Sequence, residues 1–265
     1  DTPKLLLNAT LCPADAFVFD LEDAVPADRK TDALWLVDAA LRALDYGHGE
    51  VSVRINAGQA GIDEATFLCG AGVEAFWVPK CERVEDILAL DQALSTTGSP
   101  ALLVLLIESA VGVENAYELV RCCPRIVAAS LGVEDYLRDV RAERTEGQAE
   151  SAWARGRVLN AAVAAGVMPL ASVYPRFEDL TAVTAYARSA RAAGYRGVGC
   201  IHPAQIEAVH AGFAPSADEV EHARRVVEAF DASGHQAVAV DGRMVDEPVY
   251  LHARQTLAEA EDADR

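Results

Sequence analysis

The chain has 265 residues, a formal net charge of −18, and 51% hydrophobic against 24% charged residues. A surface this acidic repels phosphate backbones and anionic lipids, so we expect neither a nucleic-acid nor a membrane partner. The longest uninterrupted apolar run, 101–107, is far shorter than the roughly 20 residues that span a bilayer. The length suits a single α/β domain, because barrels of that class run to about 250 residues.

The cysteine pattern is typical of free thiols. The six cysteines form no C-x-x-C pair, and two of them, Cys122 and Cys123, are adjacent. Cysteines of this kind are usual in a reducing compartment. Because the sequence also shows no secretory signal, we expect a cytoplasmic protein.

Predicted strands and helices alternate along the chain. Short β-branched and apolar runs predict strands at 16–20, 51–55, 75–78, 101–107, 126–131, 170–173 and 197–201. Apolar residues at helical spacing predict helices at 28–44, 63–69, 84–94, 113–122, 149–165, 177–193, 203–211, 216–232 and 247–260. An arginine-rich loop is expected at 138–147, and a glycine-containing break at 234–242 precedes the last helix.

Strand–helix units in series predict a parallel sheet with helices outside it. An open doubly wound sheet would need a glycine-rich phosphate-binding turn, and the sequence contains no G-x-G-x-x-G. We therefore expect an α/β fold, a (β/α)8 TIM barrel whose first strand lies before Asp1. A catalytic barrel domain is expected at 1–233, followed by a C-terminal helical extension at 234–265.

Chemistry-bearing side chains follow nearly every predicted strand. They are Asp20, Glu22, Asp23, Arg54, Asn56, Lys80, Glu108, Ser109, Glu134, Asp135, Ser172, Tyr174 and His202. Barrel enzymes place their sites at the C-terminal ends of the strands, so these residues are the site candidates. Carboxylates dominate the set, and no Cys or His cluster has zinc-like spacing. Oxygen ligands of this kind favour Mg²⁺.

Glu108 and Asp135 are the candidate metal ligands. Glu108 follows the most apolar strand, where an ionised carboxylate needs a partner because its burial costs several kcal/mol. Asp135 ends the next predicted strand, AASLGVED, and neighbouring strands would bring both carboxylates to one cation. Alternatively, each carboxylate caps the helix that follows it. Position alone leaves both interpretations open.

Three other strand-end residues also have two interpretations. Arg54 can bind a substrate carboxylate through two hydrogen bonds, or it can form an ion pair with Glu22 or Asp23. Lys80 can act as a Schiff-base nucleophile, but surrounding carboxylates would keep its amine charged. His202 can belong to the site, or it can pack against the barrel as a helix-entry residue.

Together these motifs resemble the citrate lyase β-subunit-like branch of the HpcH/HpaI aldolase superfamily. The matching stretches are FDLEDAVPADRK (19–30), VRIN (53–56), VPK (78–80), IESAVGVENA (107–116), LGVEDYLRD (131–139), CIHPAQI (200–206), FAPSADEVEHARRVVEAF (213–230) and DGRMVDEP (241–248). A single motif would be weak evidence, whereas eight in the same order are specific.

The resemblance implies a Mg²⁺-dependent carbon–carbon lyase that cleaves or forms 3-hydroxyacyl-CoA thioesters, such as malyl-, citramalyl- or citryl-CoA. It implies a homotrimer or hexamer. It places the metal on Glu108 and Asp135. By the same resemblance, the catalytic residues are Asp246, Arg54 and Glu22, and the substrate-binding residues are Arg54, Gly132, Val133, Glu134, Asp23 and Lys80. Family members deliver the acid that corresponds to Asp246 from the C-terminal segment of a neighbouring subunit.

Two other functions are compatible with the sequence. One is a class II pyruvate-type aldolase that acts on a free hydroxy-oxoacid, but no histidine base lies before His48. The other is a non-catalytic barrel that binds an acyl-CoA or a carrier. The chain departs from the family pattern at Ala171, Ser172 and Val198, around the substrate pocket, which leaves the acyl group open.

Overall fold

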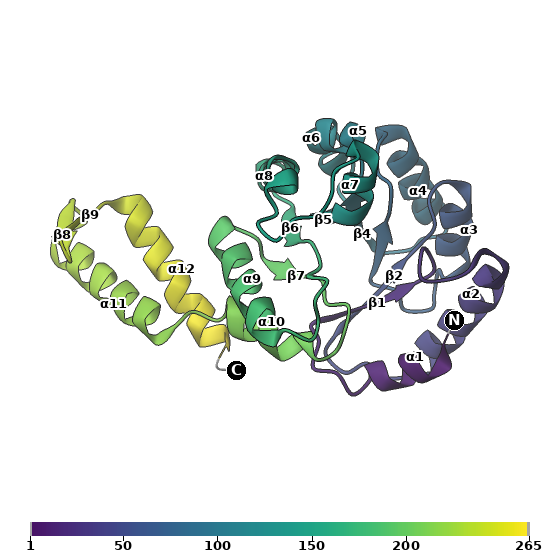
Figure 1. Ribbon diagram of the computed structural model, residues 1–265, viewed down its shortest axis with the longest axis horizontal. Helices are drawn as coiled ribbons and strands as arrows, with labels where there is room; N and C mark the ends of the chain where they lie inside the picture. The colour runs from purple at the N-terminus through teal and green to yellow at the C-terminus, as the bar shows by residue number, and fades with distance from the viewer. Residues whose placement is uncertain (1, 264–265) are drawn as a thin grey trace.

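A computed structural model describes residues 2–263 of the chain and contains a curved, seven-stranded parallel sheet (Figure 1). Each strand pairs with the next in the sequence. The strands are β1 (Ala16–Asp20), β2 (Glu50–Arg54), β3 (Ala75–Val78), β4 (Leu102–Ile107), β5 (Ile126–Leu131), β6 (Met168–Ala171) and β7 (Gly197–Val198). Consecutive parallel strands require a crossover after each strand, and helices provide it.

Helices lie around the outside of this sheet (Figure 1). They are α1 (Pro3–Ala9), the short 3-10 helix η1 (Ala27–Arg29), α2 (Lys30–Ala43), α3 (Gln59–Phe67), α4 (Val84–Thr96), α5 (Ala110–Glu114), α6 (Ala116–Val120), α7 (Val133–Val140), α8 (Ala149–Ala164), α9 (Leu180–Ala193) and α10 (Gln205–Phe213). The single helix expected at 113–122 is two short helices with Asn115 between them.

The sheet is built around the apolar strand β4. Its residues 103–107 are all buried, as expected for a strand with neighbours on both sides and packing on both faces. The main hydrophobic core joins strands β1 to β5 with the helices outside them. The carboxyl ends of these strands are therefore held on a rigid base, which is where the candidate side chains lie.

The predicted barrel is only partly present. Among residues 2–263 the sheet has seven strands, and no strand pairs with the outer edges of β1 and β7. The two ends of the curved sheet nevertheless approach each other. His210 on α10 lies 3.0 Å from Asp15, the residue before β1. The observed fold is thus a curled half-barrel with helices outside it.

Residues 216–263 project from the sheet as a separate unit, which we name the arm (Figure 1). The arm contains α11 (Ala217–Ala232), the antiparallel hairpin β8 (Val238–Val240) and β9 (Arg243–Val245), and α12 (Glu247–Ala263). It has its own small core, in which the rings of Phe230 and Tyr250 stack with centroids 4.8 Å apart. The boundary expected at residue 233 separates α11 from the hairpin that packs against it.

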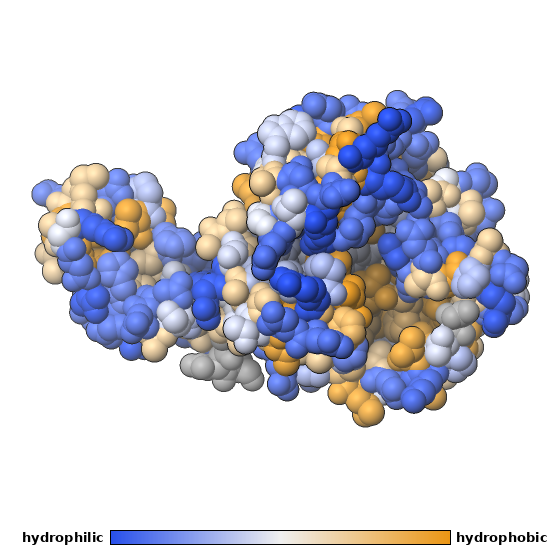
Figure 2. Space-filling view, in the orientation of Figure 1, coloured by the Kyte–Doolittle hydropathy of each residue, from blue (hydrophilic) through white to orange (hydrophobic). Residues whose placement is uncertain are grey.

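None of the helices within residues 2–263 combines the length and apolar character that a membrane span requires. The space-filling view shows hydrophilic residues over much of the surface that faces the viewer, including α11 (Figure 2). The same view shows a hollow inside the ring of helices, with apolar residues on its walls (Figure 2).

Candidate active site

The first part of the site is an ion-pair network at the ends of β1 and β2. Asp20 and Arg54 are register partners on these two strands. Arg54 donates from Nε and Nη2 to the two carboxylate oxygens of Asp20 at 2.8 and 2.5 Å. Its Nη1 lies 3.2 Å from Glu22 Oε2. The ion-pair interpretation of Arg54 is therefore correct for Glu22, but the stronger partner is Asp20, a strand-end candidate to which no role had been assigned.

The charges of this network support one another. Burial alone would raise the pKa of Asp20, but the hydrogen bonds and charge of Arg54 outweigh it, so the pKa of Asp20 is lowered. Burial opposes the charge on Arg54, and the contacts with Asp20 and the nearby Glu22 still raise the pKa of Arg54. Three of its five N–H groups are in use, which leaves two for a ligand.

Lys80 connects the network to the next strand end. Its Nζ donates to Glu22 Oε1 and lies 3.6 Å from Asp23 Oδ1. Its backbone has a positive φ of 54°, a strained conformation for a residue with a side chain. The hydrogen bond with Glu22 is the main reason that the pKa of Lys80 is raised. A charged ammonium is a poor nucleophile, so this environment disfavours a Schiff-base role for Lys80.

Glu108 is a buried carboxylate with an incomplete set of partners. Its exposed fraction is 6%, and Oε2 is buried without a hydrogen-bond partner among the described residues. Burial, with the charges of Asp135 and Glu22, raises its pKa to about 7, although Arg54 and Lys80 act in the opposite direction. A buried acid of this kind requires a proton or a cation at its free oxygen.

The capping interpretation fails for both candidate ligands. Ser109, not Glu108, caps α5, and its Oγ accepts from the Gly112 N–H. Gly132 is the N-cap of α7, and no side chain bonds there. We expected Asp135 to end strand β5, and this prediction is wrong. Asp135 lies in the first turn of α7, and its Oδ1 is 2.8 Å from Nη2 of Arg138.

Gly132 allows Glu108 to approach the chain closely. A Cβ atom at residue 132 would lie 2.6 Å from the Cγ of Glu108, so any other residue type would displace the Glu108 side chain. Of the other predicted substrate-binding residues, Val133 is buried in the core. The carboxylate of Glu134 pairs with Arg144, and Glu134 does not line the cavity described next. The structure thus gives Gly132 a positional role beside the carboxylate.

A cavity of about 330 Å³ opens beside Glu108, and we name it the carboxylate cavity. It is lined by Lys80, Glu82, Glu108, Ser109, Asp135, Arg138 and Asp139. The structure therefore brings four predicted candidates, Lys80, Glu108, Ser109 and Asp135, into one cavity. Arg54 does not line it, but its charge acts on Glu108. Glu82, Arg138 and Asp139 have no strand-end position, so sequence reasoning missed them.

The donor set suits a hard divalent cation. Within residues 2–263, no three Asp, Glu, His or Cys residues lie close enough together to hold a metal by themselves. A cation such as Mg²⁺ needs only one or two carboxylates, because water and substrate oxygens fill its other positions. The unpartnered Oε2 of Glu108 beside Asp135 is consistent with that arrangement.

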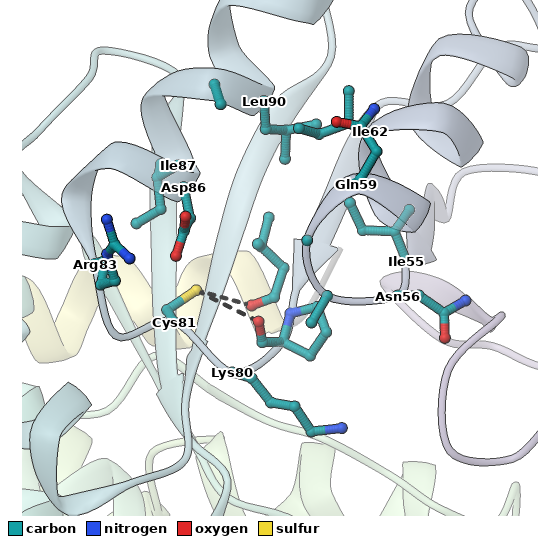
Figure 3. A pocket seen from close by; sticks show the side chains of 15 residues that line it. Ile55, Asn56, Gln59, Ile62, Lys80, Cys81, Arg83, Asp86, Ile87 and Leu90 are labelled. Carbon is teal, nitrogen blue, oxygen red and sulfur yellow. Dashed lines mark hydrogen bonds between the residues drawn. The ribbon is translucent and has the colours of Figure 1, made fainter.

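A second cavity, of about 280 Å³, lies between the loops after β2 and β3 (Figure 3). Lys80 lines this cavity as well as the carboxylate cavity. Its Asn56 is already engaged, because Nδ2 donates to the Leu21 carbonyl and to Glu64. The Cys81 thiol lies toward the Val78 and Pro79 carbonyls (Figure 3). Both of these polar groups of the second cavity are therefore already partnered.

Two candidates lie away from the carboxylate cavity. His202 stacks on Phe177, and its Nδ1 accepts from the Ala204 N–H at 3.1 Å, as expected for a helix-entry residue. Asp246 lies on the arm between β9 and α12, at the end farthest from the sheet (Figure 1). Within one chain, Asp246 lines neither cavity.

The family model described as HpcH/HpaI aldolase/citrate lyase matches residues 1–203. The chain belongs to the HpcH/HpaI aldolase/citrate lyase family. The resemblance inferred from the sequence motifs is therefore confirmed, including its citrate lyase β-like character.

Two relatives and one solved structure illustrate the sequence identity and the coverage of these matches. The citrate lyase subunit beta of Escherichia coli is 34% identical over 97% of this chain and 89% of its own length. A (3S)-malyl-CoA thioesterase of Cereibacter sphaeroides is 33% identical over 97% of this chain and 90% of its own length. The crystal structure of CitE from Mycobacterium tuberculosis, in complex with magnesium, acetoacetate and coenzyme A, matches with a TM-score of 0.86 and 30% sequence identity. The match covers 98% of this chain and 94% of the CitE chain.

Proposed function

We propose that this chain is a Mg²⁺-dependent carbon–carbon lyase that cleaves or forms a 3-hydroxyacyl-CoA thioester, giving an acyl-CoA and an oxoacid. The observation that carries the proposal is the buried, half-partnered carboxylate of Glu108 beside Asp135. The family relatives named as citrate lyase β subunits and a malyl-CoA thioesterase support the substrate class, and the CitE complex with magnesium and coenzyme A supports the cofactor.

In this proposal Glu108 and Asp135 hold the cation. When bound, Mg²⁺ would lower the energy of the alkoxide that forms when the 3-hydroxyl of the substrate loses its proton. Arg54 has two free N–H groups for the carboxylate of the oxoacid half. Asp20 and Glu22 fix the guanidinium so that it costs no reorganisation during the reaction.

The remaining network sets the charge around the site. Glu22 is almost fully buried and is shared between Arg54 and Lys80. Loss of Glu22 would leave two cations without their common partner, so we assign it a catalytic supporting role. Asp23 touches the network only through Lys80, and we assign Lys80 and Asp23 to substrate binding. The backbone of Gly132, Val133 and Glu134 at the start of α7 would receive the acid end of the substrate.

The proton step needs an acid other than the two proposed cation ligands. Cleavage leaves an enolate on the acyl thioester, and its carbon must be protonated. We assign this step to Asp246 of a neighbouring subunit, because the arm holds it away from the cavity of its own chain (Figure 1). In the synthetic direction the same carboxylate would remove the thioester α-proton.

This assignment requires an assembly. Closed rings of identical chains place the arm of one subunit at the site of the next, so we propose a homotrimer or a hexamer. We further propose that residues 1–233 form the catalytic domain of (β/α)8 type and that the C-terminal segment 234–265, to which most of the arm belongs, reaches the neighbour. The six cysteines, unpaired throughout residues 2–263, fit a cytoplasmic location.

The test is an assay of malyl-, citramalyl-, citryl- and 3-hydroxy-3-methylglutaryl-CoA with Mg²⁺, in which both the oxoacid and free CoA are measured. A lyase releases an oxoacid without free CoA, whereas a thioesterase releases free CoA without an oxoacid. We expect oxoacid release that stops with EDTA. No release from any thioester, together with tight CoA binding, would instead identify a non-catalytic acyl-CoA-binding barrel.

A further inference from the structure

Two cations line the carboxylate cavity, and Arg138 has more free donors than Lys80. Lys80 is held by Glu22 and Asp23. Arg138 is 76% exposed, and its one ion pair within residues 2–263 joins Nη2 to Asp135 Oδ1 at 2.8 Å. A guanidinium has five N–H donors in a rigid fork, so most donors of Arg138 remain available.

The other arginine of the site cannot replace Arg138. Arg54 is fixed by Asp20 and Glu22 and does not line the carboxylate cavity. Its two remaining N–H groups are sufficient for one carboxylate. On the walls of this cavity, Arg138 is therefore the cation with the most free donors for a second carboxylate of the same substrate.

The contact between Arg138 and Asp135 explains how the guanidinium is held until substrate arrives. Arg138 lies one helical turn after Asp135 on α7, which keeps its charge at the cavity. Under the proposed function, Asp135 gives its oxygen to the cation. The nearby Asp139 already accepts the Ala110 N–H at 2.8 Å. Arg138 is then free to bind an anionic ligand in the cavity.

We propose that Arg138 is a specificity-determining residue that binds a second carboxylate on the oxoacid half of the substrate. It would thereby select thioesters that release a dicarboxylate oxoacid over those that release a monocarboxylate one. Citryl-CoA and citramalyl-CoA form a matched pair, because a carboxymethyl group in the first stands where the second has a methyl group. This inference rests on the proposed function, since it names the substrate class of the same site.

The experiment measures kcat/KM for both thioesters in the wild type and in Arg138→Gln. We expect the ratio of citryl to citramalyl cleavage to fall by about 10- to 100-fold in Arg138→Gln, as for a site that loses a charged hydrogen-bond partner. Arg138→Lys should retain an intermediate ratio. The matched control is Arg121→Gln. Arg121 is also exposed and also pairs with an acid three residues earlier, Glu118, but it does not line the carboxylate cavity.

Binding of two hydroxy acids gives a second readout that does not depend on turnover. Calorimetry with Mg²⁺ present compares malate with lactate, which differ by one carboxylate. We expect tighter binding of malate in the wild type and loss of most of that difference in Arg138→Gln.

The outcomes separate this inference from the proposed function. If the wild type cleaves thioesters and Arg138→Gln leaves the ratio unchanged, the inference is wrong and the lyase stands. If Arg138→Gln only binds Mg²⁺ more tightly, Arg138 merely neutralises Asp135, and the inference is again wrong. If no thioester is cleaved, the lyase proposal fails, while an Arg138-dependent preference for malate would still support the carboxylate site.

Discussion

Charged residues are arranged differently in the sheet and in the arm. In the sheet, carboxylates and cations are buried together at the strand ends, and Glu108 remains with an unpartnered oxygen. In the arm, a small apolar core carries the fold, and Asp246 stands at the far end with no ion pair among the described residues. The sheet can therefore hold a cation and a substrate, whereas the arm offers a single acid on a projecting support.

The two regions are joined by exposed and half-buried ion pairs rather than by a shared core. Arg191 on α9 contacts Glu219 at the start of α11 and Glu259 near the end of α12, at 3.0 and 3.4 Å. Arg196, before β7, contacts the same Glu259 at 2.9 Å. These contacts set the direction of the arm while leaving its far end free to meet another chain.

The largest expected effect is in the sheet. Glu108→Ala removes a proposed cation ligand, so we expect kcat/KM with Mg²⁺ to fall by at least about 1,000-fold. Glu82→Gln, which also removes a carboxylate from the carboxylate cavity but lies outside the proposed ligand pair, is the control. Unchanged turnover in Glu108→Ala would end the metal assignment.

The next effect is in the arm. Asp246→Ala should lower kcat by about 100- to 10,000-fold, the usual contribution of a positioned acid, because the enolate is no longer protonated. Mg²⁺ and substrate binding should remain close to wild type, since Asp246 lines no cavity in its own chain. A large loss of Mg²⁺ affinity in this variant would contradict the proposal that the sheet binds the cation and the arm supplies the acid.

The stability of the metal-free protein should depend on pH through Glu108. Its pKa is raised from 4.5 to about 7, mainly by burial, so the folded state holds this proton while the unfolded state has lost it. The cost to folding is absent below about pH 4.5, grows as the pH rises, and is complete above about pH 7, at up to about 3 kcal/mol. Urea unfolding in EDTA should show that Glu108→Gln stabilises the protein more at pH 8 than at pH 5. Equal effects at both values would show that Glu108 is ionised throughout.

The smallest effect concerns the junction of the two regions. Glu259→Gln weakens the contacts with Arg191 and Arg196, so we expect a several-fold loss of kcat. We expect little change in the unfolding midpoint, because ion pairs near the surface contribute about 1 kcal/mol or less. Glu221→Gln, which breaks a pair with Arg225 inside the arm, is the control. Equal kcat values for the two variants would show that the junction does not position Asp246.

Much of the fold could be predicted because its strands are strongly apolar. Strands β1, β3 and β5 have the expected bounds, and Glu108 was found because a carboxylate follows the buried β4. The hairpin of the arm was missed, since three-residue strands give little periodicity. Its Asp241–Gly242 turn, with positive φ at both residues, was the available signal.

The contacts between the site residues were harder to predict than the identity of those residues. Asp20 and Arg54 are 34 residues apart, and only the register of β1 on β2 makes them partners. Arg138 was assigned to a loop, because the helix α7 was not predicted. Its contact with Asp135 follows from helical spacing, which cannot be used for a segment that is not assigned to a helix.

The most direct test of the account combines two inactive chains. Asp246→Ala keeps an intact cation site, and Glu108→Gln keeps an intact arm, so co-expressed or co-refolded mixtures can form complete sites only between different subunits. We predict that an equal mixture recovers about a quarter of wild-type activity, because neighbours pair at random in a ring. A mixture no more active than its separate components would contradict a site that is shared between the sheet of one subunit and the arm of the next.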